Sequence, residues 1–349
     1  MNQLFRWDQM GLFLLALAAG ILPFAVPEVC AAALREGLTL CSGPLLLSLF
    51  PFLVVSRLLI QCPESDLLAL LFRLAAWGIG IRTPCAARVL CIGFLGGFAP
   101  AASAAAQAVR TGQLTAEEAD ALLPACICSG PSFVVLTVGQ SLLGSAELGV
   151  LLFASQITAN YLTAALLNRF VGVRSVKPGS AAPASPAPPR LDEILADAAI
   201  TYCKLCGFIL FFRMLAAGAG ALLPAGAGTL CSILLEVCSG CDLASRTRRW
   251  GSLLCCAALS VQGLSVLLQV RTICPPEMTL RPLYRARLLH LPLSLALFYL
   301  LLPGGEADVF STLPARVLLM RRVPPDCALL VFAVCCMAAC TLRSGIRQV

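Results

Sequence analysis

The chain has 349 residues, of which 59% are hydrophobic and only 12% are charged. Soluble domains carry roughly 25% charged residues, so this composition excludes an ordinary water-soluble fold. The mean hydropathy of +0.89 instead predicts an integral membrane protein. We therefore expect an all-α polytopic membrane protein with about eight transmembrane helices of roughly 20 residues each, and the lipid bilayer as its main partner.

The net charge of +7 comes mainly from arginines in short loops and at the ends of apolar runs. This pattern is typical of loops retained on the cytoplasmic side of a membrane. The chain has no basic stripe with interleaved aromatic residues, so we expect no nucleic-acid partner.

The residues suited to metal binding are nineteen cysteines and one histidine. Most cysteines lie in apolar runs, where they act as small hydrophobic side chains. Two CxxC pairs, Cys203/Cys206 and Cys238/Cys241, leave a zinc or redox site open, although few charges nearby would stabilise thiolates. His290 stands at the mouth of an apolar run and is expected at the membrane interface. Walker, GxSxG and HExxH motifs do not occur, so we expect no catalytic residues, no metal and no cofactor.

The chain begins with two apolar runs. Residues 10–30, inside an N-terminal transmembrane segment at 1–37, and residues 38–60 each contain prolines, which neighbouring helices can accommodate in a membrane. Residues 67–82 are shorter and contain Arg73, so a helix on the membrane surface and a tilted span are equally open.

The next stretch predicts a broken helix. Residues 89–108 are rich in glycine and alanine around Pro100, which favours close backbone approach and a re-entrant hairpin. Thr115 and Glu118 have the spacing of a capping box, so a helix should begin there and continue through residues 121–140.

A linker divides the chain. Residues 147–170 form another apolar run, whereas the Pro/Ala/Ser-rich stretch at 172–193 cannot bury a core. The arginines that flank this linker place it in the cytoplasm. It separates a first half at 38–171 from a second half at 194–302. Beyond the linker, the apolar runs are 200–223, 229–240, 251–270, 286–302 and 327–342. The last run belongs to a predicted C-terminal transmembrane helix and tail at 303–349.

The two halves repeat an order of features. In the first half 45-LLLSLFPFLVVSRLL precedes 92-IGFLGGFAPAAS and 127-ICSGPSFVVLTVGQ. In the second half 202-YCKLCGFILFFRMLA precedes 231-CSILLEVCSGCDLAS and 259-LSVQGLSVLLQVRT. Interrupted apolar segments at matching positions are typical of secondary transporters, whose broken helices meet near the bilayer midplane. The alternative is that the small residues only pack helices tightly.

Several of these segments carry a resemblance to a known family. Its residues are Ser129-Gly130-Pro131 with Phe133, the LTAEEA helix, Glu236 with Gly240, and Gly263-Leu264-Ser265-Val266 ending in Gln269. Over roughly residues 38–300 the chain resembles the sporulation integral membrane protein YlbJ family and the wider nucleoside-recognition Gate domain of nucleoside and ferrous-iron permeases. The resemblance implies two related helical repeats with re-entrant hairpins. It also implies a role in spore (cortex) formation, in a bacterial cell membrane around the developing spore.

The sequence departs from the family pattern at two places. The usual Gly-aromatic-Pro-x-Gly-Ala pattern stands here as Gly97-Phe98-Ala99-Pro100-Ala101-Ala102, and the asparagines expected before Ser-Gly-Pro are Ile127 and Cys128. Two polar ligands of the family are therefore missing at this hairpin.

The candidate site combines both halves. An acidic side chain deep in a membrane costs about 2.5 kcal/mol or more, so Glu236 is interpreted as a proton-coupling or cation-binding carboxylate, unless it faces water at the lip of a hairpin. Gln262, Ser265 and Gln269 have the spacing of one helical face and would line a cavity or bond neighbouring helices. The candidate substrate- or ion-binding residues are Gly97, Pro100, Ser129, Gly130, Glu236, Gly240, Gly263, Ser265 and Gln269.

Two arginines, Arg57 and Arg213, hold corresponding places in the two halves and are expected to snorkel from the ends of spans. The function that we expect is a transporter or permease-like protein for an unknown small solute or ion in spore formation. The alternative is a non-transporting membrane scaffold for spore envelope assembly. A homo-oligomer, or contact with other sporulation membrane proteins, is compatible with both.

Overall fold

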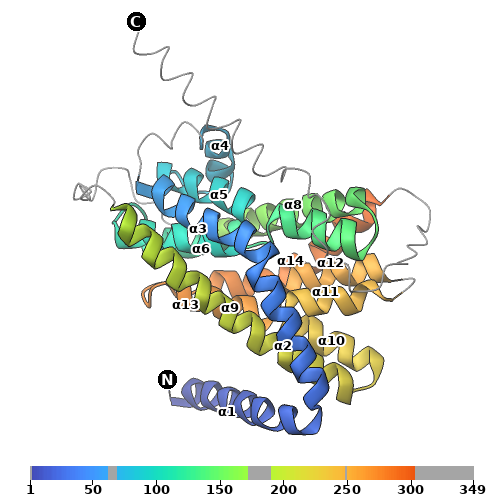
Figure 1. Cartoon of the computed structure of the whole chain (residues 1–349). Helices are drawn as coiled ribbons and strands as arrows, with labels where there is room; N and C mark the ends of the chain where they lie inside the picture. Colours follow the sequence, from blue (N-terminus) through green and yellow to red (C-terminus); the bar gives the residue numbers. More distant parts are fainter. Residues whose placement is uncertain (1, 62–68, 172–189, 248–249, 303–349) are drawn as a thin grey trace, which may run out of the picture.

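The computed structural model describes residues 2–61, 69–171, 190–247 and 250–302. Within these ranges the chain forms fourteen α-helices and one π-helix, with no β-strand (Figure 1). The all-α prediction is therefore confirmed for the part of the chain that the structure describes. Most of the linker and the C-terminal segment at 303–349, including its predicted span at 327–342, lie outside the described residues.

The chain before the linker, which is called the first half from here on, contains nine helices with boundaries that follow prolines and glycines. They are α1 (Asn2–Ala25), α2 (Pro27–Ser42), α3 (Pro44–Gln61), α4 (Leu70–Gly78), α5 (Pro84–Gly96), α6 (Phe98–Arg110), α7 (Ala116–Cys126), the π-helix η2 (Ser132–Leu142) and α8 (Ala146–Val171). The residue before a proline avoids the α conformation, so helices end at Val26 and Gly43 and begin again at Pro27 and Pro44. The predicted runs at 10–30 and 38–60 therefore cross helix boundaries that the prolines set.

The second half contains six helices. They are α9 (Leu191–Leu222), α10 (Ala225–Leu235), α11 (Val237–Ser245), α12 (Gly251–Val261), α13 (Gly263–Ile273) and α14 (Arg281–Leu301). The apolar runs at 229–240 and 251–270 are interrupted, at Glu236 and at Gln262.

Four helical stretches are long and apolar enough to cross a membrane. They are Pro27–Leu47, Ala146–Phe170, Leu191–Leu222 and Gly251–Ile273. Many large apolar side chains on the outside of the molecule are exposed, among them Phe24, Leu166 and Leu288. A multi-pass membrane protein accounts for both observations.

The described part of residues 67–82 contains one short helix, α4 (Leu70–Gly78). Helix α4 has nine residues and a length of about 14 Å, which is too short for a hydrocarbon core of about 30 Å. Leu71, Leu74 and Trp77 are exposed on it, and Arg73 lies over the Trp77 ring at 5.8 Å. These features fit a surface helix.

A long antiparallel helix pair joins the two halves. Helices α2 and α3 lie along α9 in the opposite direction (Figure 1), and the Tyr202 hydroxyl donates to the Cys41 carbonyl oxygen. Arg57 on α3 forms an ion pair with Asp197 on α9. Arg213 on α9 forms the reciprocal ion pair with Glu36 on α2, at 2.8 Å.

Both arginine side chains are largely buried, with 10% and 12% of their surface exposed. The snorkelling expectation did not include these partners: each guanidinium group is held by an exposed carboxylate of the opposite helix.

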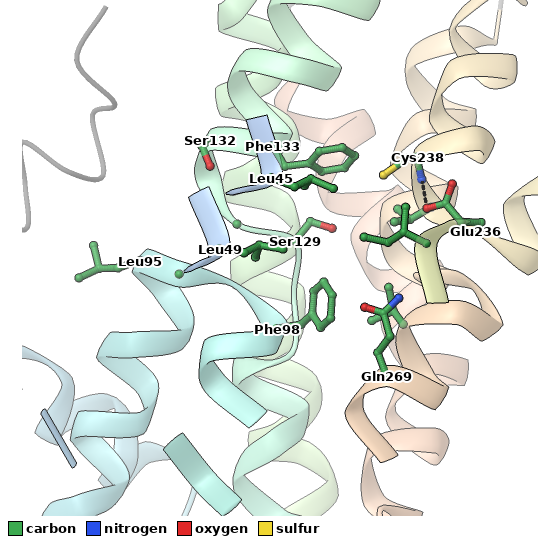
Figure 2. Close-up of a pocket in the computed structure, with 15 residues that line it drawn as sticks. Leu45, Leu49, Leu95, Phe98, Ser129, Ser132, Phe133, Glu236, Cys238 and Gln269 are labelled. Atoms are coloured by element: carbon green, nitrogen blue, oxygen red, sulfur yellow. Dashed lines mark hydrogen bonds between the residues drawn. The ribbon is translucent and has the colours of Figure 1, made fainter. Parts of the chain in front are cut away.

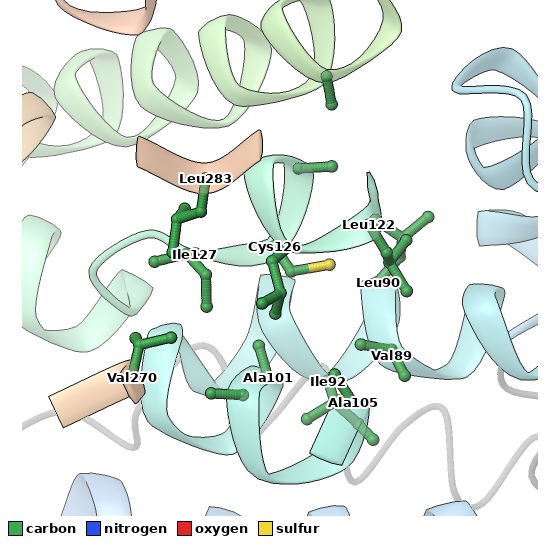
Figure 3. Packing of buried hydrophobic residues seen from close by; sticks show 14 of the residues in the cluster. Val89, Leu90, Ile92, Ala101, Ala105, Leu122, Cys126, Ile127, Val270 and Leu283 are labelled. Atoms are coloured by element: carbon green, nitrogen blue, oxygen red, sulfur yellow. The ribbon is translucent and has the colours of Figure 1, made fainter. Parts of the chain in front are cut away.

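The core is built from broken helices with small residues. Val89 of α5, Ala101 and Ala105 of α6 and Cys126 of α7 pack closely together (Figure 3). The capping box predicted at Thr115 and Glu118 is confirmed, but its helix ends at Cys126 instead of continuing through residue 140. The chain then runs extended before η2 begins at Ser132. Four breaks thus interrupt the central helices, at Gly97, at 127–131, at Glu236 and at Gln262.

Candidate functional site

The first two breaks touch each other at glycines. Gly97, between α5 and α6, has φ +81° and ψ −162°, a backbone region that is essentially restricted to glycine. A Cβ atom at Gly97 would lie 2.6 Å from the Gly130 nitrogen and 2.9 Å from its Cα atom. We call this contact between Gly97 and Gly130 the first crossing.

The two breaks of the second half touch in the same manner. Gly263 follows Gln262 between α12 and α13, and both residues have positive φ, at +68° and +61°. A Cβ atom at Gly263 would lie 2.9 Å from the Glu236 nitrogen and from the Leu235 carbonyl oxygen. We call this contact between Gly263 and Glu236 the second crossing.

A pocket lies between the two crossings (Figure 2). Its cavity volume is about 60 Å³, which leaves room for a small cation or a few water molecules. The first crossing contributes Gly96, Phe98, Ser129, Gly130, Ser132 and Phe133, the second contributes Glu236, Val237, Cys238, Val266 and Gln269, and the long helices contribute Leu45, Leu49 and Ile209.

Glu236 is the only carboxylate in this lining, and it is 2% exposed. Its two carboxylate oxygens accept hydrogen bonds from the backbone N–H groups of Cys238 at 2.8 Å and Ser239 at 2.7 Å. It is therefore the N-cap of α11, where the partial positive charge of the helix end stabilises an anion. Burial excludes the interpretation of Glu236 as a carboxylate facing open water.

Gln269 brings an acceptor without a partner to the same wall of the pocket. Its Nε2 atom donates to the Ser265 hydroxyl at 2.8 Å, whereas its buried Oε1 atom has no hydrogen-bond partner among the described residues. Figure 2 shows Glu236 and Gln269 on one side of the pocket, with Phe98 and Ser129 on the other. A carboxylate and a free amide oxygen together favour a ligand that donates hydrogen bonds or carries positive charge.

The structure brings six of the nine candidate residues to the pocket or to the crossings that form it. Ser129, Gly130, Glu236 and Gln269 line the pocket, and Gly97 and Gly263 make the crossings. The other three candidates are Pro100, Gly240 and Ser265.

These three residues support the site from behind. Pro100 packs in the first turn of α6, where its ring would meet a Cβ atom at Gly96 at 2.9 Å. Gly240 allows α11 to approach α10, since a Cβ there would lie 2.8 Å from the Ile233 Cα atom. Ser265 acts only by holding Gln269.

The expectation that Gln262 shares a helical face with Ser265 and Gln269 was wrong for Gln262. It lies in the break with a left-handed backbone, and its Nε2 atom donates to the Ile127 carbonyl oxygen at 3.4 Å. Only Ser265 and Gln269 share the helical face, one turn apart on α13.

Sequence reasoning missed a second polar cluster behind the crossings. His290 was expected at an interface, but it is 1% exposed, and one ring nitrogen lies 3.2 Å from the Gln156 carbonyl oxygen. Arg287 is buried on the same helix, unlike the arginines that the sequence places in short loops and at the ends of apolar runs. The signal was present in the spacing of the residues on the buried face of α14, which are Leu283, Ala286, Arg287, His290, Ser294 and Phe298.

The acidic residues of the LTAEEAD segment are used by the fold. Glu118 completes the capping box and accepts a hydrogen bond from the Thr83 hydroxyl at 2.6 Å. Asp120 accepts from the backbone N–H groups of Thr279 and Leu280, which lead into α14. This segment therefore fixes the position of α14 behind the pocket.

Metal ligands do not gather in the described part of the chain. The two CxxC pairs lie on different helices, α9 and α11, and no group of three or more His, Cys, Asp or Glu side chains in the described part could hold a metal ion.

In comparisons with known proteins, no family model, no curated protein and no solved structure matches the chain.

Proposed function

We propose that the chain is a multi-pass membrane transporter for a small polar solute or cation, and that the pocket between the two crossings is its binding site. The observation that carries this proposal is the pocket wall formed by Glu236 and the unpartnered Oε1 atom of Gln269. A role in spore formation is part of the proposal and is supported by the sequence resemblance alone.

The arrangement of the helices supports two related repeats. Each half contains a long helical stretch (α2–α3 or α9), two broken helices that cross at a glycine, and a final long helix (α8 or α14). These segments would be eight membrane segments of the part of the chain that the structure describes, in addition to α1.

The orientation of the halves supports an inverted relation. Two reciprocal ion pairs, Arg57–Asp197 and Arg213–Glu36, connect the antiparallel long helices. In each pair the arginine comes from one half and the carboxylate from the other, as a two-fold axis between the halves would require. Inverted repeats with interrupted helices at a shared site are typical of secondary transporters.

A non-transporting scaffold for spore envelope assembly is the second candidate. Two observations favour it: both oxygens of Glu236 already cap α11, and Ile127 and Cys128 replace the polar ligands of the resembling family. In a scaffold, Glu236 would serve the fold only.

Uptake of candidate solutes into proteoliposomes separates the two functions. Glu236→Gln removes the charge at nearly constant volume, and Glu236→Ser keeps a side chain that can cap α11. If the carboxylate binds the solute, both folded variants lose uptake, whereas the matched control Glu117→Gln, in the exposed first turn of α7, retains it. Full uptake by both Glu236 variants, or no uptake of any solute by the unaltered protein, would leave the scaffold as the better proposal.

A further inference from the structure

The guanidinium group of Arg287 joins the broken helices of the two halves. One terminal nitrogen donates to the carbonyl oxygen of Ile127 at 2.6 Å, and the other donates to that of Ser260 at 3.3 Å. Ile127 caps the C-terminal end of α7, and Ser260 belongs to the last turn of α12. Figure 3 shows Ile127 next to Leu283, in the turn of α14 that precedes Arg287.

The charge of Arg287 is compensated by helix ends instead of by a carboxylate. The ion pairs between described residues do not include it, although the residue is only 8% exposed. A helix C-terminus carries roughly half a negative elementary charge. The ends of α7 and α12 therefore supply about one negative charge together, which matches one guanidinium group.

Two further amide side chains contact the Ile127 carbonyl oxygen. Asn160 and Gln262 donate their amide N–H groups to the Ile127 carbonyl oxygen at 3.2 and 3.4 Å. Their own side-chain oxygens are buried and have no hydrogen-bond partner among the described residues. The oxygen atoms that Arg287 itself contacts are the two backbone carbonyls of Ile127 and Ser260, and carbonyl oxygens are ligands that hard cations accept.

In secondary transporters, unwound carbonyls and half-helix C-termini coordinate the coupling cation. We propose that Arg287 is a built-in substitute for such a cation: its side chain occupies a cation site formed by the ends of α7 and α12. The folded protein then needs no inorganic cation at this position. Removal of the guanidinium group leaves a site that Na⁺ or free guanidinium can fill. This inference concerns stability and does not depend on transport.

Thermal unfolding of the purified full chain in detergent tests the inference. All proteins in this test carry Glu236→Gln, so that cation binding in the proposed pocket does not contribute. At equal ionic strength, the protein that retains Arg287 should then unfold at the same temperature in sodium, potassium and choline chloride. Arg287→Ala should unfold roughly 5–10 °C lower in choline chloride. Sodium or low-millimolar guanidinium should recover part of that loss in a saturable manner, as for a ligand that binds only the folded state. Guanidinium at that concentration has a negligible denaturing effect.

Two outcomes would overturn the inference. One is a saturable stabilisation of the Glu236→Gln protein with Arg287 intact when sodium replaces choline, because the site at Arg287 would then still need a cation. The other is a folded Arg287→Ala variant that responds to neither sodium nor guanidinium.

If Arg287→Ala does not fold in any salt, Arg287→Lys and Arg287→Met decide. A lysine variant near the original unfolding temperature and a methionine variant far below it would support a need for charge. Equal losses in both variants would assign Arg287 a packing role and would refute the proposal that its side chain replaces a bound cation.

Discussion

At both crossings two interrupted helices approach each other closely, but different interactions hold them together. At the first crossing two glycines, Gly97 and Gly130, meet without a charged side chain, and the N-terminal ends of α6 and η2 have no side-chain cap. At the second crossing Gly263 meets the backbone of Glu236, whose carboxylate caps α11. The first crossing therefore depends on steric fit, whereas the second depends on a hydrogen-bonded charge as well.

The largest expected effect is that of Gly97→Ala. The new Cβ atom would strain the backbone at φ +81° and would clash with the Gly130 nitrogen at 2.6 Å. We expect a loss of roughly 3–5 kcal/mol in the free energy of unfolding, measured by thermal unfolding in detergent. Gly207→Ala on α9, where the added atom meets nothing within 4 Å, should be neutral or stabilising by contrast.

Gly263→Ala tests the second crossing in the same way as Gly97→Ala tests the first. Gly263 has a left-handed φ of +68°, which other residues can adopt at a cost of about 1–2 kcal/mol. The contact with Glu236 nitrogen at 2.9 Å adds to that cost. We expect a smaller loss than for Gly97→Ala in the same unfolding assay. If the two losses were equal, steric fit would not distinguish the crossings.

The next effect concerns the cap of α11. Glu236→Ala leaves the N–H groups of Cys238 and Ser239 without acceptors, so we expect a loss of about 1–2 kcal/mol in the free energy of unfolding. Glu236→Ser should restore most of that loss, because a hydroxyl can cap a helix. A serine variant as unstable as the alanine variant would mean that the negative charge, and not the hydrogen bond, holds the second crossing.

The smallest effects are expected for the two ion pairs between the halves. Double-mutant cycles with Arg57→Met and Asp197→Asn, and with Arg213→Met and Glu36→Gln, should each give coupling energies of about 0.5–1 kcal/mol. Their values should be similar, since the carboxylates are exposed to similar extents, 61% and 66%. A coupling found in only one pair would contradict the two-fold relation that we propose.

The sequence predicted features that depend on neighbouring residues. The capping box of Thr115 and Glu118 follows from spacing alone and is present. The breaks were harder to predict, because glutamate and glutamine are ordinary helix residues. Glu236 leaves the helical conformation because its carboxylate caps the next helix, and Gln262 turns left-handed beside Gly263.

The buried roles of Arg287 and His290 depend on distant parts of the chain. The Ile127 carbonyl that holds Arg287 lies 160 residues earlier, and the Gln156 carbonyl beside His290 lies 134 residues earlier. A basic residue near the start of an apolar run is expected at the membrane interface unless such partners are known. Glu236, Gln269 and Ser129 line one pocket, and the interrupted segments in both halves had indicated that these parts of the chain meet.

The π-helix η2 has a consequence for how the pocket wall can move. A π-helix bonds each N–H group to the carbonyl five residues earlier, so every turn holds more residues than an α-turn. Its far end is clamped, because Gly139 lies against Gly149 of α8, whereas its near end carries Ser132 and Phe133 in the pocket lining. Conversion of one turn to α geometry would rotate those two side chains about the helix axis. The wall would then change shape by a screw motion of one helix, with no need for a hinge.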